Sequence, residues 1–185
     1  MRKLLLAAAF VTGALSFAQT FGVKAGLNIS SISDSDGKSK AGFYGGVLMN
    51  VPVASSFSVQ PEVLYSGLGA KNDGSPELKV NLDYISVPVM FQYNATPEFY
   101  LEAGPQFSFL VNSKFKYQSL SVDANDYMKT FDFGIGIGAG YYFQQKFGIT
   151  ARYVAGVTDI MKEISGYDVK GKNNVFQIGL AYKFK

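Results

Sequence analysis

Four charged residues in this chain could do chemistry together. Lys24, Glu62, Glu102 and Arg152 are far apart in the sequence, but each lies where apolar residues alternate with small or polar ones. Two carboxylates could act as an acid and base pair, and carboxylates beside cations could neutralise them or line an ion path. The chain contains no His and no Cys, so the usual catalytic triads and transition-metal sites lack their ligands. The sequence therefore predicts no catalytic residue, no cofactor and no metal site.

The alternation around these residues has a period of two, which is the period of a β-strand. With that period, all four charges point to the same side of their strands. Each lies about three to five residues from the predicted periplasmic end of its strand, so the four should share one height in a closed barrel. Small eight-stranded barrels fill their interior with side chains. We favour an internal plug of mutually neutralising charges, and the alternative is a gated or narrow ion path lined by them.

The alternation is clearest between Phe131 and Phe143, where apolar residues hold every odd position and glycine most of the even ones. Because no segment has the pattern needed to cover the apolar face, we expect lipid to cover it. Glycine at every second position favours a narrow lumen that leaves room for bulky side chains such as Tyr44 or Tyr142. A soluble lipocalin-like barrel predicts the reverse pattern, with an apolar interior and a polar exterior.

Eight alternating stretches follow one another, and short connections alternate with long ones. The predicted strands cover residues 21–32, 41–51, 57–69, 81–93, 98–111, 128–143, 147–160 and 174–184. Strands of this length can cross the hydrocarbon layer when tilted. We therefore predict an all-β fold, an eight-stranded antiparallel up-and-down transmembrane β-barrel. Its short turns should lie in the periplasm and its long loops outside the cell.

The N-terminus has the pattern of a secretory signal. Arg2 and Lys3 precede an apolar run, and Ser16-Phe17-Ala18 fits a cleavage site of the small-x-small type. We expect a cleavable signal peptide at 1–18 and one outer-membrane barrel domain at 19–185. Without the basic pair, 15 of the 17 basic residues remain against 14 acidic ones. This near balance predicts no nucleic-acid partner.

Residues 82–88 (LDYISVP) and 101–105 (LEAGP) resemble the fourth and fifth strands of the outer-membrane β-barrel domain family that is common in Bacteroidota. The opening residues 22–28 (GVKAGLN) are typical of the same family, and the resemblance covers 21–184. It implies the barrel fold and a place in the outer membrane. Some relatives, the PorT-like proteins, are linked to protein secretion, so the resemblance also leaves an accessory role in secretion open.

The C-terminus resembles the signal that the barrel assembly machinery binds during biogenesis. The matching residues are a polar residue, a glycine and two aromatic residues, namely Gln177, Gly179, Tyr182 and Phe184. The family pattern ends on the last aromatic residue, whereas Lys185 follows it here. The resemblance implies the assembly machinery as a partner. The alternative is an ordinary final strand whose two aromatic residues face lipid.

The longest predicted loop, 112–127, contains Phe115, Tyr117 and Tyr127 among charged residues. Exposed aromatic residues on a loop are candidate contacts for a protein or glycan partner. They could equally extend the aromatic girdle above the membrane. We expect a non-enzymatic outer-membrane protein that acts through its surface loops or periplasmic rim as a binding or structural protein. The alternatives are a small pore for ions or small solutes and an accessory protein of a secretion system.

Overall fold

The structure, a computed structural model, describes residues 19–33, 38–71, 78–117, 120–123, 128–162 and 171–184. The predicted signal peptide at 1–18 and the candidate contact residue Tyr127 lie outside these residues. In the part of the chain that is described, no helix is long and apolar enough to span a membrane.

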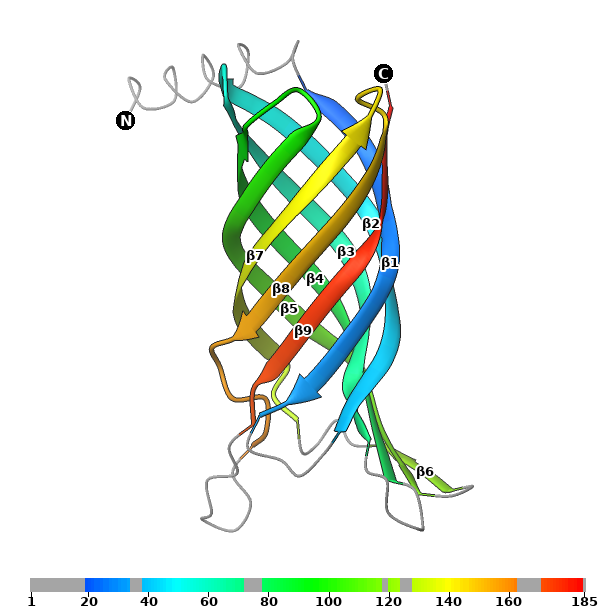
Figure 1. Cartoon of the computed structure of the whole chain (residues 1–185). Coiled ribbons are helices and arrows are strands. Elements are labelled where there is room, and N and C mark those ends of the chain that lie inside the picture. Colours follow the sequence, from blue (N-terminus) through cyan, green and yellow to red (C-terminus); the bar gives the residue numbers. More distant parts are fainter. Residues whose placement is uncertain are drawn as a thin grey trace, which may run out of the picture.

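Strands make up nearly all of the described chain. In order they are β1 (Thr20–Ile32), β2 (Lys38–Ala54), β3 (Phe57–Lys71), β4 (Leu78–Asn94), β5 (Phe99–Tyr117), β6 (Leu120–Asp123), β7 (Phe131–Phe143), β8 (Phe147–Gly156) and β9 (Asn173–Lys183). They pair antiparallel in the order β4-β3-β2-β1-β9-β8-β7-β5-β6, and an additional pairing between β4 and β5 closes the barrel (Figure 1). The short strand β6 pairs with β5 and projects beside the rim. The predicted eight-stranded antiparallel barrel is therefore confirmed.

The two ends of the barrel differ in their connections. The start of β1 at Thr20, the end of β9 at Lys183 and the short connections β2–β3, β4–β5 and β7–β8 lie at one end, which we call the turn end (Figure 1). The strand ends that border the other connections lie at the opposite end, which we call the loop end (Figure 1). Barrels of this kind place short turns in the periplasm and long loops outside the cell.

Apolar side chains cover the outside of the wall, and charged ones lie inside. Phe43, Ile137 and Leu180 are between 65% and 71% exposed, whereas Lys24 and Arg152 are at most 3% exposed. A soluble lipocalin-like barrel would show the reverse distribution. The outside of this wall is suited to contact with hydrocarbon.

The interior is built in layers from one end to the other. At the turn end, a small apolar cluster contains Leu48, Tyr100, Tyr142 and Ala181. Charged and amide side chains fill the adjoining layer. At the loop end lies a larger apolar cluster of buried residues, namely Ile32, Leu68, Ala70, Leu82, Tyr84, Met128, Val154, Ile160 and Val175.

The prediction of a loop at 112–127 was wrong for residues 112–117 and 120–123, which form strands. β5 continues to Tyr117, because residues 78–83 of β4 extend equally far and pair with residues 112–117. β6 then pairs with the same part of β5 from its other edge. Phe115 and Tyr117 are therefore strand residues, and Phe115 packs against the apolar cluster at the loop end. Phe115 is only partly exposed.

Candidate functional site

Arg152 of β8 lies at the centre of the interior charge cluster, which we define as Lys24, Glu62, Glu102 and Arg152. Its Nη2 and Nη1 donate to Glu62 Oε1 and Oε2 at 2.7 and 2.9 Å. Its Nε donates to Glu102 Oε1 at 2.7 Å. One guanidinium thus binds two carboxylates, and its contact with Glu62 is bidentate, the stronger geometry for such pairs.

The strand order explains how these residues meet. Three strands separate β8 from β3 in either direction around the wall, so Arg152 and Glu62 reach each other across the barrel. Glu102 comes from β5, which is separated from β8 by β7 alone. The alternation that the sequence shows brings all of them to the inner face.

Lys24 and neighbouring amides complete the hydrogen bonding of the carboxylates. Lys24 Nζ lies 3.4 Å from Glu62 Oε1, and Gln60 Nε2 donates to the same oxygen at 2.9 Å. Gln92 Nε2 donates to Glu102 Oε2 at 3.0 Å. Asn50 Nδ2 in turn donates to Gln92 Oε1 at 2.8 Å. All four carboxylate oxygens therefore accept at least one hydrogen bond.

Two glycines of β7 make the space that the cluster occupies. Gly138 lies between Glu102 and Arg152 in the cross-strand register, where a Cβ atom would be 3.1 Å from Glu102 Oε1. A Cβ atom on Gly136 would be 3.5 Å from Arg152 Cδ and 2.8 Å from Met90 Cε. The glycine pattern leaves room for bulk, as predicted.

The bulk opposite these glycines is not the pair that the sequence suggested. Tyr44 lies against Gly26 and Gly179 of β1 and β9, and Tyr142 lies against Gly148 of β8. Sequence alternation gives the face of each residue but not its partner across the lumen, so this detail could not be predicted.

Stacked aromatic side chains cover the cluster on the turn-end side. The rings of Tyr100 and Tyr142 have centroids 5.8 Å apart with an interplanar angle of 29°. Lys183 Nζ lies 4.0 Å from the centroid of the Tyr142 ring. On the loop-end side, Gln177 Nε2 donates to Asn28 Oδ1 at 2.9 Å. These groups separate the charges from both ends of the barrel.

The charges of the cluster balance, with two cations and two carboxylates. Such a set can be buried at tolerable cost only when each charge has an opposite partner and its hydrogen bonds are satisfied. Its members are at most 3% exposed. Chemically, this arrangement can hold opposite walls of the barrel together, and it offers a substrate no accessible acid or base.

The candidate residues of the C-terminal signal lie on and just after β9. Gln177 is buried and faces the interior, whereas the rings of Tyr182 and Phe184 contact each other on the outside, with centroids 5.5 Å apart. Gly179 lies opposite Gly26 in the pairing of β9 with β1. Sequence reasoning missed Gln92 and Lys183, although both occupy inward positions of their strands.

Comparison with known proteins was made at the level of families and of solved structures. A model for the outer membrane protein beta-barrel domain matches residues 17–162. Neisserial surface protein A has a TM-score of 0.62 and 14% identity, over 89% of this chain and 97% of that one. Ail, the attachment invasion locus protein of Yersinia pestis, has a TM-score of 0.55 and 14% identity, over 91% and 100%.

A major outer membrane protein from Thermus thermophilus is also similar, with a TM-score of 0.54 and 14% identity over 90% of this chain and 100% of that one. At such identities the likeness shows the fold alone. None of the curated proteins compared with the chain matches it. The family model, however, spans most of the sequence and covers the strands β1 to β8 of the barrel. The chain therefore belongs to the outer membrane protein beta-barrel domain family and is an outer-membrane β-barrel protein.

Proposed function

We propose that this protein is a closed, non-conducting and non-enzymatic barrel that acts as a binding or structural protein through the surfaces it presents outside the bilayer. The observation that carries the proposal is the contact between Arg152 and Glu62, which crosses the lumen from one wall to the other. An ion path would have to pass between these two side chains. The apolar cluster at the loop end lies on the same path.

The surface best suited to a partner is the hairpin of β5 and β6. Lys114, Lys116 and Tyr117 lie on its β5 strand, where they are exposed, and Val122 on β6 is 60% exposed. A projecting edge that combines aromatic, aliphatic and cationic side chains suits a protein or glycan partner. Ail has been crystallised in complex with the heparin analogue sucrose octasulfate, which makes this compound a reasonable first glycan probe.

The test is single-channel conductance in a planar bilayer. The protein would be purified from outer membranes in detergent, and its folded state would be checked by the shift in gel mobility on boiling. We expect a folded protein that gives no conductance steps. Steady steps in the same preparation would overturn the closed barrel and favour a small pore, with Glu62, Glu102 and Arg152 as its selectivity residues.

A pair of matched variants makes an absence of conductance steps informative. Arg152→Ala removes the side chain that crosses the lumen, and Lys129→Ala removes an exposed cation at the loop end. If the plug blocks the path, Arg152→Ala should give more frequent openings than the wild type, and Lys129→Ala should not. Binding at the β5–β6 hairpin is measured separately, as retention of the protein on immobilised glycans with and without Tyr117→Ala, because Tyr117 is 48% exposed there.

Three finer assignments belong to the same proposal. We infer that residues 1–18 are removed on export and that residues 177–184 bind the barrel assembly machinery. Mass measurement of the protein from outer membranes tests the removal of residues 1–18.

Assembly of a Phe184→Ala variant in cells tests the binding of the assembly machinery. An accessory role in secretion, as in the PorT-like proteins of Bacteroidota, would appear as loss of secreted proteins on deletion.

A further inference from the structure

A row of four lysines crosses the wall at the loop end. The strand registers place Lys38 opposite Lys71, Lys71 opposite Lys79, and Lys79 opposite Lys116. Residues that lie directly opposite each other point to the same face of a sheet. We call these four residues the lysine row, and it runs across β2, β3, β4 and β5.

The lysine row lies on the outside of the barrel. Leu68 and Leu82 are partners in the pairing of β3 with β4, and both are buried in the interior. Lys71 and Lys79 each lie three residues from one of these leucines. Because side chains alternate along a strand, an odd spacing places them on the opposite face.

The lysine row concentrates positive charge on this part of the wall, because like charges lie directly opposite one another in the strand pairings. Among the described residues, the carboxylates on this part of the wall are Asp83 and Asp123. Asp83 Oδ2 accepts a hydrogen bond from Asn112 Nδ2 at 2.9 Å. Asp123 lies opposite Lys114, which is a further cation beside the row.

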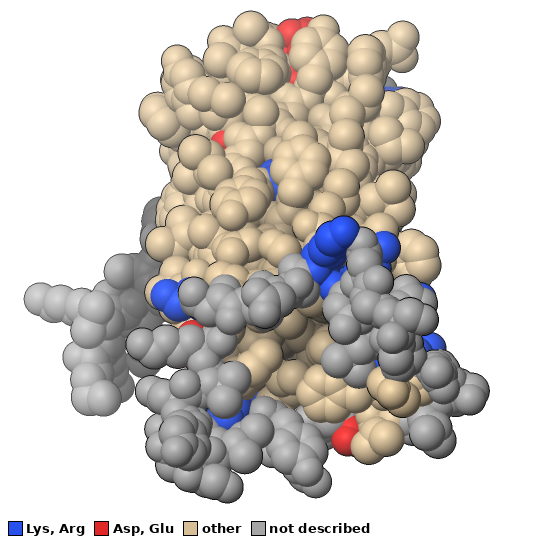
Figure 2. Space-filling view, turned by 60° about the horizontal axis from the view of Figure 1, so that its bottom comes forward, with Lys and Arg blue, Asp and Glu red and all other residues tan. Residues whose placement is uncertain are grey.

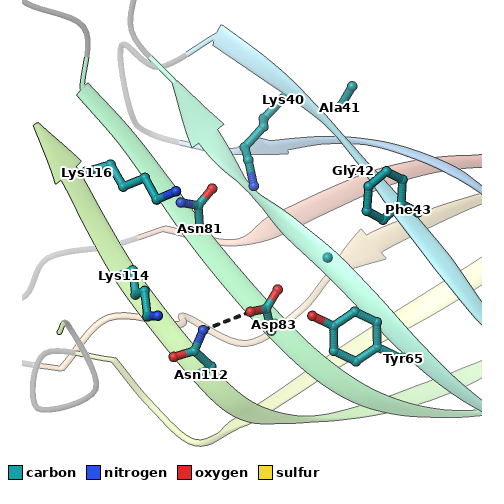
Figure 3. Close-up of a pocket in the computed structure, with 11 residues that line it drawn as sticks. Lys40, Ala41, Gly42, Phe43, Tyr65, Asn81, Asp83, Asn112, Lys114 and Lys116 are labelled. Carbon is teal, nitrogen blue, oxygen red and sulfur yellow. Dashed lines mark hydrogen bonds between the residues drawn. The ribbon is translucent and has the colours of Figure 1, made fainter. Parts of the chain in front are cut away.

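A pocket of about 540 Å³ opens on the same wall. Figure 3 shows the ammonium ends of Lys40 and Lys116 on the two sides of Asn81 and that of Lys114 beside Asn112. Lys40 Nζ donates to the carbonyl oxygen of Leu68 at 2.8 Å. An ammonium group has three donors, so this bond leaves Lys40 able to bind a ligand as well.

The other residues that line the pocket are of two kinds. Asn81, Asp83 and Asn112 supply amide and carboxylate groups that can hydrogen-bond to hydroxyl groups. Phe43 and Tyr65, which are 71% and 47% exposed, form its edge toward the middle of the barrel. The pocket is therefore cationic and polar on one side and continuous with the lipid-facing wall on the other.

The pocket lies where the apolar outer wall gives way to charged residues toward the loop end. Lys71 follows Tyr65 by six residues on β3, which is roughly 20 Å along the strand. With the usual strand tilt of about 40°, this is roughly 15 Å along the membrane normal. Figure 2, viewed partly from the loop end, shows blue side chains gathered where the tan wall meets that end. Lysines at this level can extend their ammonium groups to lipid phosphates.

We propose that this pocket binds the phosphate-bearing, hydroxyl-rich headgroup of a lipid in the leaflet that faces the cell exterior. Lys40, Lys114 and Lys116 contact the phosphate oxygens, and the amides and Asp83 contact the hydroxyl groups. The acyl chains lie against Phe43 and Tyr65. A soluble anion would make no use of this apolar edge. The inference goes beyond the proposed function, because it holds whether or not the barrel conducts.

The experiment measures lipid binding to the full protein in lipid-free detergent. The probe is lipid A with both phosphates, and the comparison lipid is the same molecule after removal of its phosphates. The pocket variant is Lys114→Gln/Lys116→Gln. Its matched control, Lys129→Gln/Lys162→Gln, removes two exposed cations from the same end of the barrel but outside the pocket. Heat-dependent gel mobility checks that every variant is folded.

We expect the wild type and the control to bind lipid A with similar affinity and the pocket variant to bind on the order of tenfold or more weakly, as loss of two near-surface lysines predicts. Higher salt should reduce the difference. Equal loss in the control would overturn the assigned site. Equal binding of the dephosphorylated lipid would overturn phosphate recognition. Competition by millimolar inorganic phosphate alone would indicate a soluble-anion site and overturn the lipid.

Discussion

Arg152 and Glu62 come from opposite walls of the barrel, and two hydrogen bonds of 2.7 and 2.9 Å join them. Such a contact holds β8 and β3 together without any backbone pairing between them. Because both groups are buried, neither can exchange its partner for water when the contact is removed. Loss of one member of the interior charge cluster should therefore strongly destabilise the barrel.

Replacement of Arg152 by alanine should destabilise the barrel by about 3–5 kcal/mol, because Glu62 and Glu102 would remain buried without their main cation. The measurement is urea unfolding in detergent or lipid vesicles. It is monitored by circular dichroism, because the chain contains no Trp. Lys129→Ala serves as the exposed control and should change the free energy of unfolding by no more than about 0.5 kcal/mol. Equal stability of both variants would mean that the cluster is hydrated.

A double-mutant cycle should show that Arg152 and Glu62 act as a pair. Glu62→Gln alone leaves Lys24 and Arg152 against Glu102, whereas Glu62→Gln/Arg152→Gln leaves one cation and one carboxylate inside. The double variant should be more stable than the sum of the single losses predicts, by about 0.5–3 kcal/mol. The cycle of Glu62→Gln with Lys129→Gln is the control. Additivity in both cycles would contradict a direct contact.

The face of each interior residue could be predicted from the sequence, because a period of two assigns it as soon as a strand is recognised. For this reason the sequence alone predicts that Lys24, Glu62 and Arg152 lie inside together. The contacts across the lumen could not be predicted, since they depend on strand order and register. Gln92 was missed for this reason: its partner Glu102 lies on the neighbouring strand, and no local pattern links them.

The loop end was harder to predict than the barrel wall. Asn112, Lys114 and Lys116 give the end of β5 the composition of a loop, and its pairing with β4 and β6 decides the outcome. The lysine row was not visible in the sequence either. It requires the registers of four strands, and a register shift between Ser39 and Tyr44 of β2 contributes to one of them.

Replacement of Gly138 by alanine should destabilise the barrel, although alanine is usually favoured over glycine in an extended strand. The new Cβ atom would lie 2.5 Å from the carbonyl oxygen of Ala151 and 3.1 Å from Glu102 Oε1. Such overpacking costs about 1–3 kcal/mol. At Gly45, the nearest atoms to a Cβ would be 3.7 Å away, so Gly45→Ala should be neutral or slightly stabilising. The free energy of unfolding of both variants is measured in the same detergent. Equal effects at both glycines would contradict the tight packing around Gly138.

A lysine introduced on the outside of the wall should report how deeply that position lies in the bilayer. Ile137 is the central residue of β7 and is 65% exposed, whereas Val53 is 56% exposed and lies next to the short turn after β2. In phospholipid vesicles, Ile137→Lys should cost about 2–4 kcal/mol, and Val53→Lys no more than about 1 kcal/mol. The difference arises because an ammonium group near the interface can reach water, whereas one at the midplane remains in hydrocarbon. Urea unfolding from vesicles measures both values. A soluble barrel would tolerate the two substitutions almost equally, so equal costs would place water rather than lipid against β7.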